Sequence, residues 1–293
     1  MPHRIIAATD IAACLATVPI QVEVWGDSPV PPALLLAVAR NGGFVALGYV
    51  DGDERPAGFV FGFLGIHNGH FRHHSHMLAV RKPHRGSGLA LALKEAQRDH
   101  CLDQGIEVVT WTMDPLEALN ATFNFAKLGA FARTYLRDHY GAMSDVLNAG
   151  LPSDRFLVEW PVGHDRTYKR LRGEDTAPSL EAAEGEGLRY VLRSERGRPA
   201  ELGAPAGESH LLLEIPGEFQ AVKRADEALA LAWRHSARAA FEAAFAAGYA
   251  AVEFLRSADG RGAYLLVPVP RPGGAGAERE RKTGAELAGA KPQ

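Results

Sequence analysis

The stretch from residue 75 to residue 113 constrains the fold of this chain more narrowly than any other. SHMLAV (75–80) has the composition of a β-strand, and RKPHRGSG follows it as a basic turn with two glycines. LALALKEAQRDHCLDQG (89–105) predicts a helix, because its apolar residues fall near one face and Gly105 ends it. IEVVTWTM (106–113) is typical of another strand. This order predicts parallel pairing of the two strands with a right-handed crossover.

The segments around this unit predict further strands and helices. GFVALGYV and AGFVFGFLG, separated by DGDERP, are typical of an antiparallel hairpin, and HNGHFR after them predicts a loop. The segment DPLEALNATFNFAKLG predicts a short helix that begins at Asp-Pro and ends at Gly129. The other predicted elements are helices over 10–17 and 32–41 and a strand over 156–162.

The chain is expected to divide into a domain over residues 1–162 and a smaller C-terminal region. Residues 163–187 are polar and poor in apolar side chains, which predicts a linker or loop. Residues 188–269 predict an α+β extension with strands, an alanine-rich helix over 224–247 and a closing hairpin. This extension could be a second half similar to the first domain or a continuation of the first sheet. Residues 270–293 predict a disordered tail.

Composition excludes several classes of protein. The net charge of −3 over 293 residues argues against a general nucleic-acid binder, which carries a basic excess. No apolar run reaches the roughly 18 residues of a membrane span, and the N-terminus lacks the order of a signal peptide. Two cysteines make no disulfide framework. We therefore expect a cytoplasmic protein without nucleic-acid or membrane partners.

The glycine turn from Arg85 to Ala90 predicts a phosphate-binding site. It lies where a strand ends and a helix begins, and the first amides of a helix have no partners within it. Glycines let a phosphate approach the backbone closely, and Arg85 adds positive charge. The Walker pattern is absent, and the dinucleotide fingerprint fails because Leu91 stands where a third glycine is required.

The spacing of Arg85, Gly88 and Ala90 resembles the Arg-x-x-Gly-x-Ala motif of the GNAT (GCN5-related N-acetyltransferase) superfamily, which binds the pyrophosphate of acyl-CoA. NATFNFAKLG resembles a second motif of that superfamily, in which Asn120, Lys127 and Gly129 match. The resemblance covers about residues 1–162. More narrowly, HHSHMLAV, WTMDPLEALN and SDRFLVEW resemble a subfamily of predicted GNAT acyltransferases with a C-terminal extension. Some members of it are thought to acylate amino acids.

This resemblance implies an α/β (α+β) fold with a mixed central sheet and a V-shaped split between the fourth and fifth strands. It implies acetyl-CoA or another acyl-CoA as co-substrate, with succinyl-CoA as one option, and no metal. The residues expected to bind this co-substrate lie on the fourth strand, in the turn and in the second motif: Leu78, Val80, Arg85, Gly86, Ser87, Gly88, Leu89, Ala90, Asn120 and Lys127.

The fourth strand also carries the predicted catalytic base. Its sequence resembles the H-x-H-x-L-A-V strand of arylalkylamine acetyltransferases, whose paired histidines relay the substrate proton, so His74 and His76 are predicted to be catalytic. A strict period of two puts these two histidines on one face with Leu78 and Val80. Imidazole, with a pKa of about 6.5, suits a base at neutral pH. A hydrogen-bonded core histidine and a zinc-binding pair are the competing interpretations.

The sequence departs from the superfamily pattern at Phe125, where many relatives carry a tyrosine that protonates the leaving thiolate. Tyr140, with Tyr135 close by, is the predicted replacement; packing with the hydroxyl at the surface is its alternative role.

Predicted substrate-binding residues are Trp111, Asp114 and Arg155. Asp114 could instead cap the following helix, and Arg155 could form a surface salt bridge.

The function expected from these observations is acyl-CoA-dependent N-acyltransfer to a small amine, with amino acids as one class, by direct attack of the amine on the thioester. The alternative is a non-catalytic CoA-binding regulatory module, which Phe125 favours. O-acylation and protein acetylation remain open, and so does a homodimer.

Overall fold

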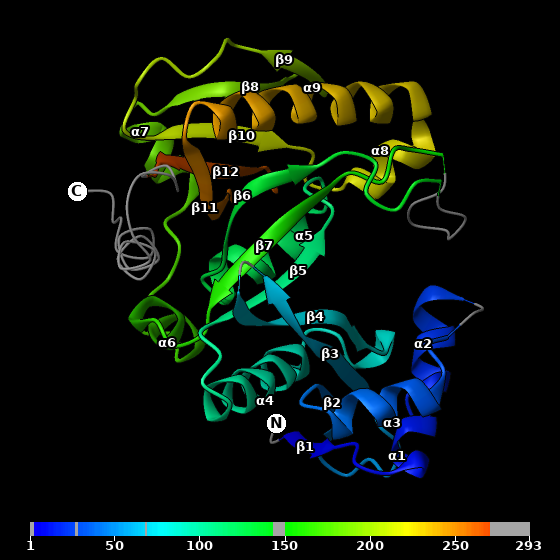
Figure 1. Ribbon diagram of the computed structural model, residues 1–293. Helices are drawn as coiled ribbons and strands as arrows, with labels where there is room; N and C mark the ends of the chain where they lie inside the picture. Colours follow the sequence, from blue (N-terminus) through cyan, green and yellow to red (C-terminus); the bar gives the residue numbers. More distant parts are fainter. Residues whose placement is uncertain (1–2, 27–28, 68, 143–149, 270–293) are drawn as a thin grey trace. The chain divides into compact units, whose positions relative to one another are not determined.

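The computed structural model describes residues 3–26, 29–67, 69–142 and 150–269 (Figure 1). The chain forms two compact units, Met1–Trp111 and Thr112–Gln293. The expected tail over 270–293 lies outside the described residues. In the part of the chain that the structure describes, no helix has the length and apolarity to span a membrane.

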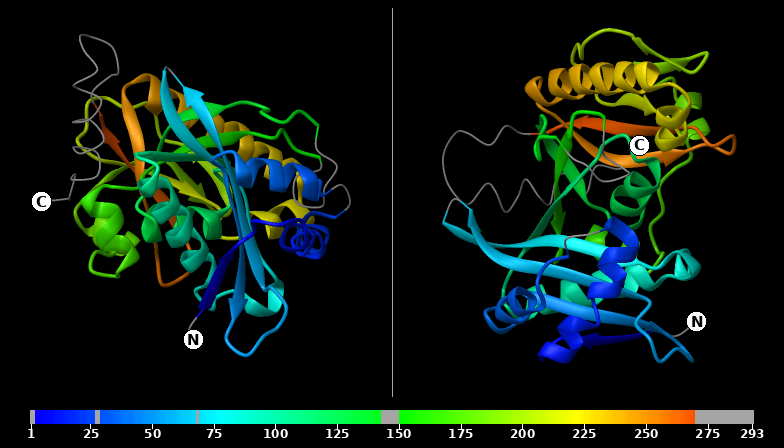
Figure 2. Two further views of the ribbon diagram at one scale, coloured as in Figure 1. Left: turned by 60° about the horizontal axis from the view of Figure 1, so that its bottom comes forward. Right: turned by 90° about the vertical axis from the view of Figure 1, so that its right-hand side faces the viewer.

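The first unit is a sheet with helices on both faces. Its strands follow the order β1-β2-β3-β4-β5, antiparallel except for the parallel pair β4 and β5. The teal helix α4 lies on one side of the blue strands, and α1–α3 lie on the other (Figure 2, left). The strands are β1 (His3–Ala7), β2 (Phe44–Val50), β3 (Gly58–His67), β4 (His70–Val80) and β5 (Val108–Met113). The helices are α1 (Ile11–Leu15), α2 (Val18–Trp25), α3 (Pro32–Arg40), the 3₁₀ turn η1 (Lys82–His84) and α4 (Leu89–Asp103).

Helix α4 is held against the sheet by its first two turns. Leu89 and Leu93 are fully buried in a cluster with apolar residues of β2 and β3. A Cβ atom at Gly48 would lie only 2.8 Å from a Leu89 methyl group, so glycine there lets the helix start come close. This packing places the glycine turn at the end of β4.

Strand β4 contains a β-bulge that changes which side chains share a face. Phe61 of β3 pairs with Met77 and Gly62 pairs with Ser75, so His76 is the extra residue. The predicted strict alternation is therefore wrong. Before the bulge, His73 and Ser75 face α4; after it, Leu78 and Val80 face α4. His74 and His76 lie on the opposite face, with Phe61, Phe63 and Met77.

The second unit is a mixed sheet with the strand order β7-β6-β11-β12-β10-β8-β9. It is antiparallel except for β10 and β8. Its strands are β6 (Phe131–Leu136), β7 (Arg155–Pro161), β8 (Arg189–Glu195), β9 (Arg198–Glu201), β10 (Leu211–Ile215), β11 (Tyr249–Arg256) and β12 (Gly262–Pro268). Its helices are α5 (Ala118–Ala121), the π-helix η2 (Thr122–Lys127), α6 (Asp165–Leu171), α7 (Leu180–Gly185), α8 (Phe219–Ala225) and α9 (Glu227–Ala246).

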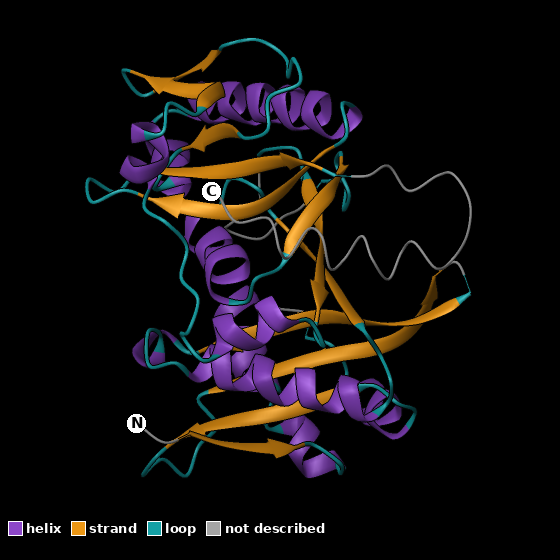
Figure 3. Cartoon of the chain, turned by 90° about the vertical axis from the view of Figure 1, so that its left-hand side faces the viewer, coloured by secondary structure: helices purple, strands orange, loops and turns teal. Residues whose placement is uncertain are grey.

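The C-terminal strands extend the sheet of β6 and β7, which is one of the two arrangements that the sequence left open. β11 pairs antiparallel with β6 at Ala251 and Ala132. The long helix α9 lies along these strands and packs against β6, β10 and β11 (Figure 3). Phe156 of β7, Phe241 of α9 and Tyr264 of β12 meet in one aromatic core. The C-terminal region and the strands β6 and β7 therefore share a single hydrophobic interior.

The fold class predicted from the sequence is confirmed: a mixed α/β structure with parallel β4 and β5 and extra C-terminal strands and helices. Several local predictions differ. The loop expected at 67–72 is largely strand, because His67 pairs with His70 and the neighbouring residues of β3 and β4 continue the ladder. The polar segment 163–187 contains α6 and α7, since buried Arg166 and Leu180 tie these helices to the core. Helical structure after β5 begins at residue 118, not at 114. The short strands β1, β6 and β9 and helix α2 were not predicted.

Candidate active site

The turn between β4 and α4 has the backbone geometry of an anion cradle. Gly86 and Gly88 have φ angles of 79° and 92°, a conformation that disfavours any residue with a side chain. Gly88 is the N-cap of α4 and has no side chain that could accept from the first amides of the helix. Arg85 Nε donates to the Val80 carbonyl at 3.2 Å, which folds the loop over the end of β4. The loop that contains these two glycines therefore leads directly into the first turn of the 15-residue helix α4.

The cradle has room for a phosphate group. A Cβ atom at Gly86 would meet nothing within 4 Å, and Arg85, Gly86 and Gly88 are exposed. The position of Ser87 is fixed by His3 of β1, whose Nε2 lies 2.9 Å from the Ser87 carbonyl oxygen. Leu89 is buried and its backbone N–H donates to Ser87 Oγ at 3.4 Å, while Ala90 is half-buried. The turn is thus open to solvent at Gly86 and Gly88.

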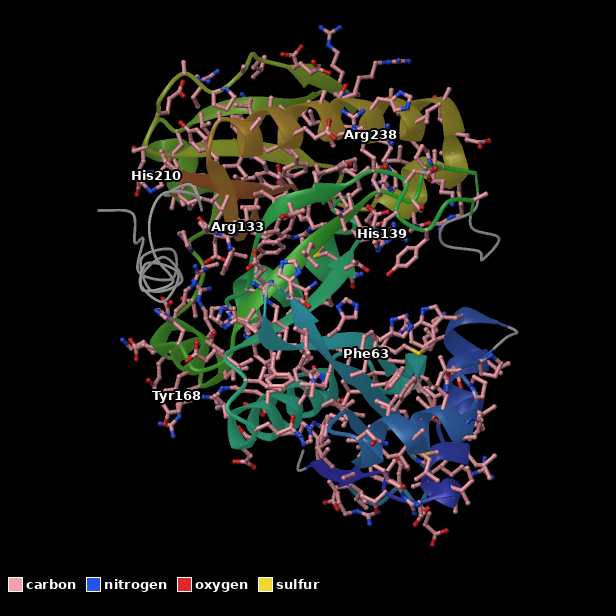
Figure 4. All side chains as sticks on the ribbon, viewed as in Figure 1. Phe63, Arg133, His139, Tyr168, His210 and Arg238 are labelled. Carbon is pink, nitrogen blue, oxygen red and sulfur yellow. The ribbon has the colours of Figure 1, made fainter. Side chains whose placement is uncertain are left out.

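The two predicted catalytic histidines lie together with two phenylalanines on one face of the hairpin of β3 and β4. Phe63, which is labelled in Figure 4, has its ring centroid 5.2 Å from that of His74 and 6.1 Å from that of His76. His74 Nδ1 lies 3.3 Å from Thr110 Oγ1 on β5. Burial lowers the pKa of His76. His76 is exposed, and with its pKa lowered the imidazole is mostly neutral at pH 7.

The parallel ladder between β4 and β5 is short. Its paired residues are His73 with Val109 and His74 with Thr110, so the ladder ends beside the histidines. Leu78 and Val80 continue β4 beyond that point toward the glycine turn. This arrangement connects the turn and the histidines along one strand within the first unit.

Three of the predicted residues belong to the second unit and lie close together there. Arg155 is buried; its Nη1 donates to the Asp154 carbonyl at 2.8 Å and lies 3.8 Å from Asp114 Oδ2. Its guanidinium carbon is 5.4 Å from the centre of the Tyr140 ring. Tyr140 is exposed, and its hydroxyl lies 2.6 Å from Thr112 Oγ1.

The Asp114 carboxylate already holds a guanidinium. Arg234 of α9 donates to both of its oxygens, at 2.8 and 2.5 Å. Asp114 also accepts from the N–H of Leu116, so it closes a turn and leaves the N-cap position of α5 to Glu117. Arg155 lies in the interior, and the surface salt bridge considered for it is not what the structure shows.

The second motif contributes two exposed residues and one core residue. Asn120 on α5 and Lys127 on η2 are exposed. Phe125, which replaces the usual tyrosine, is fully buried with its ring 5.2 Å from Tyr264 and 6.4 Å from Phe156. Tyr135 donates to Asp154, and burial raises its pKa, so of the two tyrosines considered Tyr140 has the more accessible hydroxyl.

The sequence reasoning missed Phe63, Thr110 and Lys94. The Lys94 Nζ lies 4.1 Å from the centre of the Trp111 ring, on the α4 side of the sheet. The alternation of Phe59, Phe61 and Phe63 along β3 could have placed Phe63 next to the histidines; nothing local marks Lys94 or Thr110. Across the described ranges, no three His, Cys, Asp or Glu side chains gather as metal ligands would.

Comparison with known proteins agrees with this arrangement. Residues 12–130 match the family model "Acetyltransferase (GNAT) family". No curated protein matches the chain. Solved structures similar to it include the ribosomal-protein-S18-alanine N-acetyltransferase from Escherichia coli, at 15% identity and a TM-score of 0.44, with 55% of this chain and 94% of that one covered.

Two further similar structures are an N-acetyltransferase from Staphylococcus aureus and Arabidopsis thaliana Naa50 in complex with a bisubstrate analogue. The first is 15% identical with a TM-score of 0.43 and covers 55% of this chain and 99% of that chain. The second is 17% identical with a TM-score of 0.42 and covers 54% of this chain and 98% of that chain. By this match, residues 12–130 form a GNAT acetyltransferase domain, which supports the interpretation of the protein as an acyltransferase.

Proposed function

We propose that this acyltransferase moves an acyl group from acyl-CoA to the amine nitrogen of a small molecule, with amino acids as the first acceptor class to test. The observation that carries the proposal is the pair His74 and His76, on the strand that leads directly into the glycine cradle. The cradle supplies backbone amides and Arg85 for the pyrophosphate. Succinyl-CoA and acetyl-CoA are both donors to be compared.

The proposed chemistry is a single transfer step. The amine nitrogen attacks the thioester carbonyl carbon, a C–N bond forms, the C–S bond breaks and CoA leaves as a thiolate. His76 takes the proton that the nitrogen loses, and His74, held by Thr110, passes it on. The proton ends on the thiolate or in solvent. Tyr140 stays our prediction for an acid that assists the thiolate, and Arg155 for a group that attracts a substrate carboxylate.

Partial burial suits His76 to this role. Its lowered pKa keeps the imidazole neutral at pH 7, so a proton acceptor is present without a pH shift. The Phe61 and Phe63 rings beside it exclude water from one side of the imidazole. We therefore expect kcat/KM to rise with pH through an apparent pKa below 6.5 and then to level off until the acceptor amine sets the limit.

A free-thiol assay tests the proposal. Purified protein is incubated with acetyl-CoA or succinyl-CoA and a panel of D- and L-amino acids and arylalkylamines, beside His74→Ala, His76→Ala and the double variant. We expect turnover with one acceptor class and a loss of about 10²- to 10⁴-fold in His76→Ala, the contribution of a general base. His210→Ala, which changes a histidine of the second unit (Figure 4), is the control and should retain full activity. CoA binding without thiol release from any pair would favour a binding module instead.

A further inference from the structure

Lys94 is a buried lysine in the first unit that the proposed reaction does not use. It lies on α4, and only 2% of its surface is exposed. Its Nζ donates to Gln97 Oε1 at 2.6 Å and to Ser75 Oγ at 3.2 Å. It also lies 4.1 Å from the centre of the Trp111 ring. A lysine buried this deeply is uncommon in proteins.

Polar side chains around Lys94 form a connected set of hydrogen bonds. Gln97 accepts from Lys94 and donates its own Nε2 to His73 Nε2 at 3.1 Å. Burial is the main cause that lowers the pKa of His73, to about 3, so this imidazole is neutral and can accept. A Cβ atom at Gly62 would overlap His73 Nε2, so glycine on β3 makes room for the chain of polar groups. The cluster of Lys94, Gln97, His73 and Ser75 is thus continuous.

Lys94 of α4 contacts the sheet at the point where the ladder between β4 and β5 stops. The ladder between β4 and β5 ends at His74 and Thr110. The next residues along the two strands are Ser75 and Trp111, and both contact the Lys94 ammonium. A side chain from α4 therefore spans the two strands where their ladder stops. Ser75 is also the residue between the two predicted catalytic histidines and the last one before the bulge at His76.

We propose that Lys94 is a positioning residue: its ammonium holds Ser75 of β4 and Trp111 of β5 at the point where the two strands part, and so orients the strand segment that carries His74 and His76. This inference rests on the proposed function of those histidines. Burial lowers the pKa of Lys94 to about 7, which shows that the fold holds the charge at a cost. A methionine of similar volume would remove that cost together with the contacts to Ser75 and Trp111.

The first test does not depend on turnover. Amide hydrogen exchange is measured on wild type, Lys94→Met and the control Lys169→Met, which removes a lysine of α6 that is paired with Asp165 at the surface. We expect exchange of the amides from Ser75 to Leu78 to be at least 10-fold faster in Lys94→Met, while β2 amides keep their wild-type rates. Equal protection of this segment in Lys94→Met and wild type would overturn the inference.

The second test separates positioning from a structural role. The free-thiol assay is run on the same variants and on Ser75→Ala, which removes one of the held partners. We expect kcat to fall about 10- to 100-fold in Lys94→Met while its Tm is unchanged or higher and KM for acyl-CoA moves less than 3-fold. A Tm and a kcat that fall together would instead indicate a structural lysine. Full activity in Lys94→Met would overturn the inference, although wild-type turnover would still support the proposed function. No turnover by wild type with any acceptor would overturn the proposed function itself.

Discussion

The two units bury charge in opposite ways. In the first unit, Lys94 contacts a hydroxyl, an amide oxygen and an indole ring. In the second unit, arginines are matched with carboxylates: buried Arg234 with Asp114, half-buried Arg238 with Asp154, and both buried Arg166 and Arg170 with Glu253. Arg238 lies on α9, toward the upper part of the view in Figure 4. A lysine can give up its proton when burial is costly, whereas arginine keeps its charge and needs a counter-ion.

Because of this difference, we expect the buried polar groups to have different roles in the two units. The pairs of the second unit join α6 and α9 to strands and loops far away in sequence, and they are expected to matter for stability. The cluster of the first unit lies where β4 and β5 part, and it is expected to matter for the geometry of the histidines. Each of the following predictions tests one side of the comparison.

The largest effect is expected from Glu253→Gln. Glu253 Oε2 accepts from Arg166 Nη2 at 2.9 Å and also from Arg170, and all three side chains are buried. Removing the carboxylate charge leaves Arg166 in the interior without its counter-ion and leaves Arg170 with Asp175 alone, so we expect a loss of about 3–5 kcal/mol. Urea unfolding measures this loss, with exposed Glu186→Gln as the matched control. A loss below about 1 kcal/mol would show that the second unit does not depend on its buried pairs.

A smaller effect, visible only as a pH dependence, is expected at Lys94. Its pKa is about 7 in the folded protein and near 10.5 when unfolded, so between these values the unfolded chain binds one more proton. Stability therefore rises with pH over this window, by at most about 1.4 kcal/mol per pH unit. The free energy of unfolding of wild type minus that of Lys94→Met, from urea titrations at pH 6, 7, 8 and 9, isolates this contribution. A difference that stays constant with pH would mean that Lys94 is charged throughout and is better compensated than its partners suggest.

The smallest effect is expected from Tyr135→Phe. Burial alone would raise the pKa of Asp154, but hydrogen bonds from Arg238, the Asp138 N–H and Tyr135 lower it. Losing the Tyr135 hydroxyl leaves the other two donors in place, so we expect about 1–2 kcal/mol lower stability. Thermal unfolding measures it, beside Tyr168→Phe at the exposed surface of α6. A loss as large as that of Glu253→Gln would mean that the network of Asp154 fails as a unit.

Part of the site could be predicted because its residues are close in sequence. The order of strand, glycine turn and helix from Ser75 to Asp103 specifies the cradle, since Gly86 and Gly88 are needed for positive φ and the helix start must follow them. The histidine pair was recognisable for the same reason. The faces of β4 were not, because a bulge depends on the register with β3, which alternation along one strand does not contain.

Residues brought together by the tertiary fold escaped prediction. Asp114 was considered as a helix cap or an ammonium ligand, and only the packing of α9 shows that Arg234 occupies its carboxylate. Lys94 looked like an exposed residue of an amphipathic helix, yet it is buried because the polar side of α4 meets Ser75 and His73 on β4. Phe125, where the resembling motif has a tyrosine, packs against Tyr264 of β12, a contact that the local sequence does not indicate.

The sequence by itself determined the class of fold, the parallel crossover and the phosphate-binding turn, because each depends on local backbone preferences and on periodicity over a few residues. Only the tertiary structure decided that the C-terminal region continues the sheet of β6 and β7, that the bulge at His76 turns the histidines toward Phe63, and that Lys94 lies where β4 and β5 part. These outcomes depend on strand register and on long-range packing, where the burial of a few apolar or charged groups outweighs local preference.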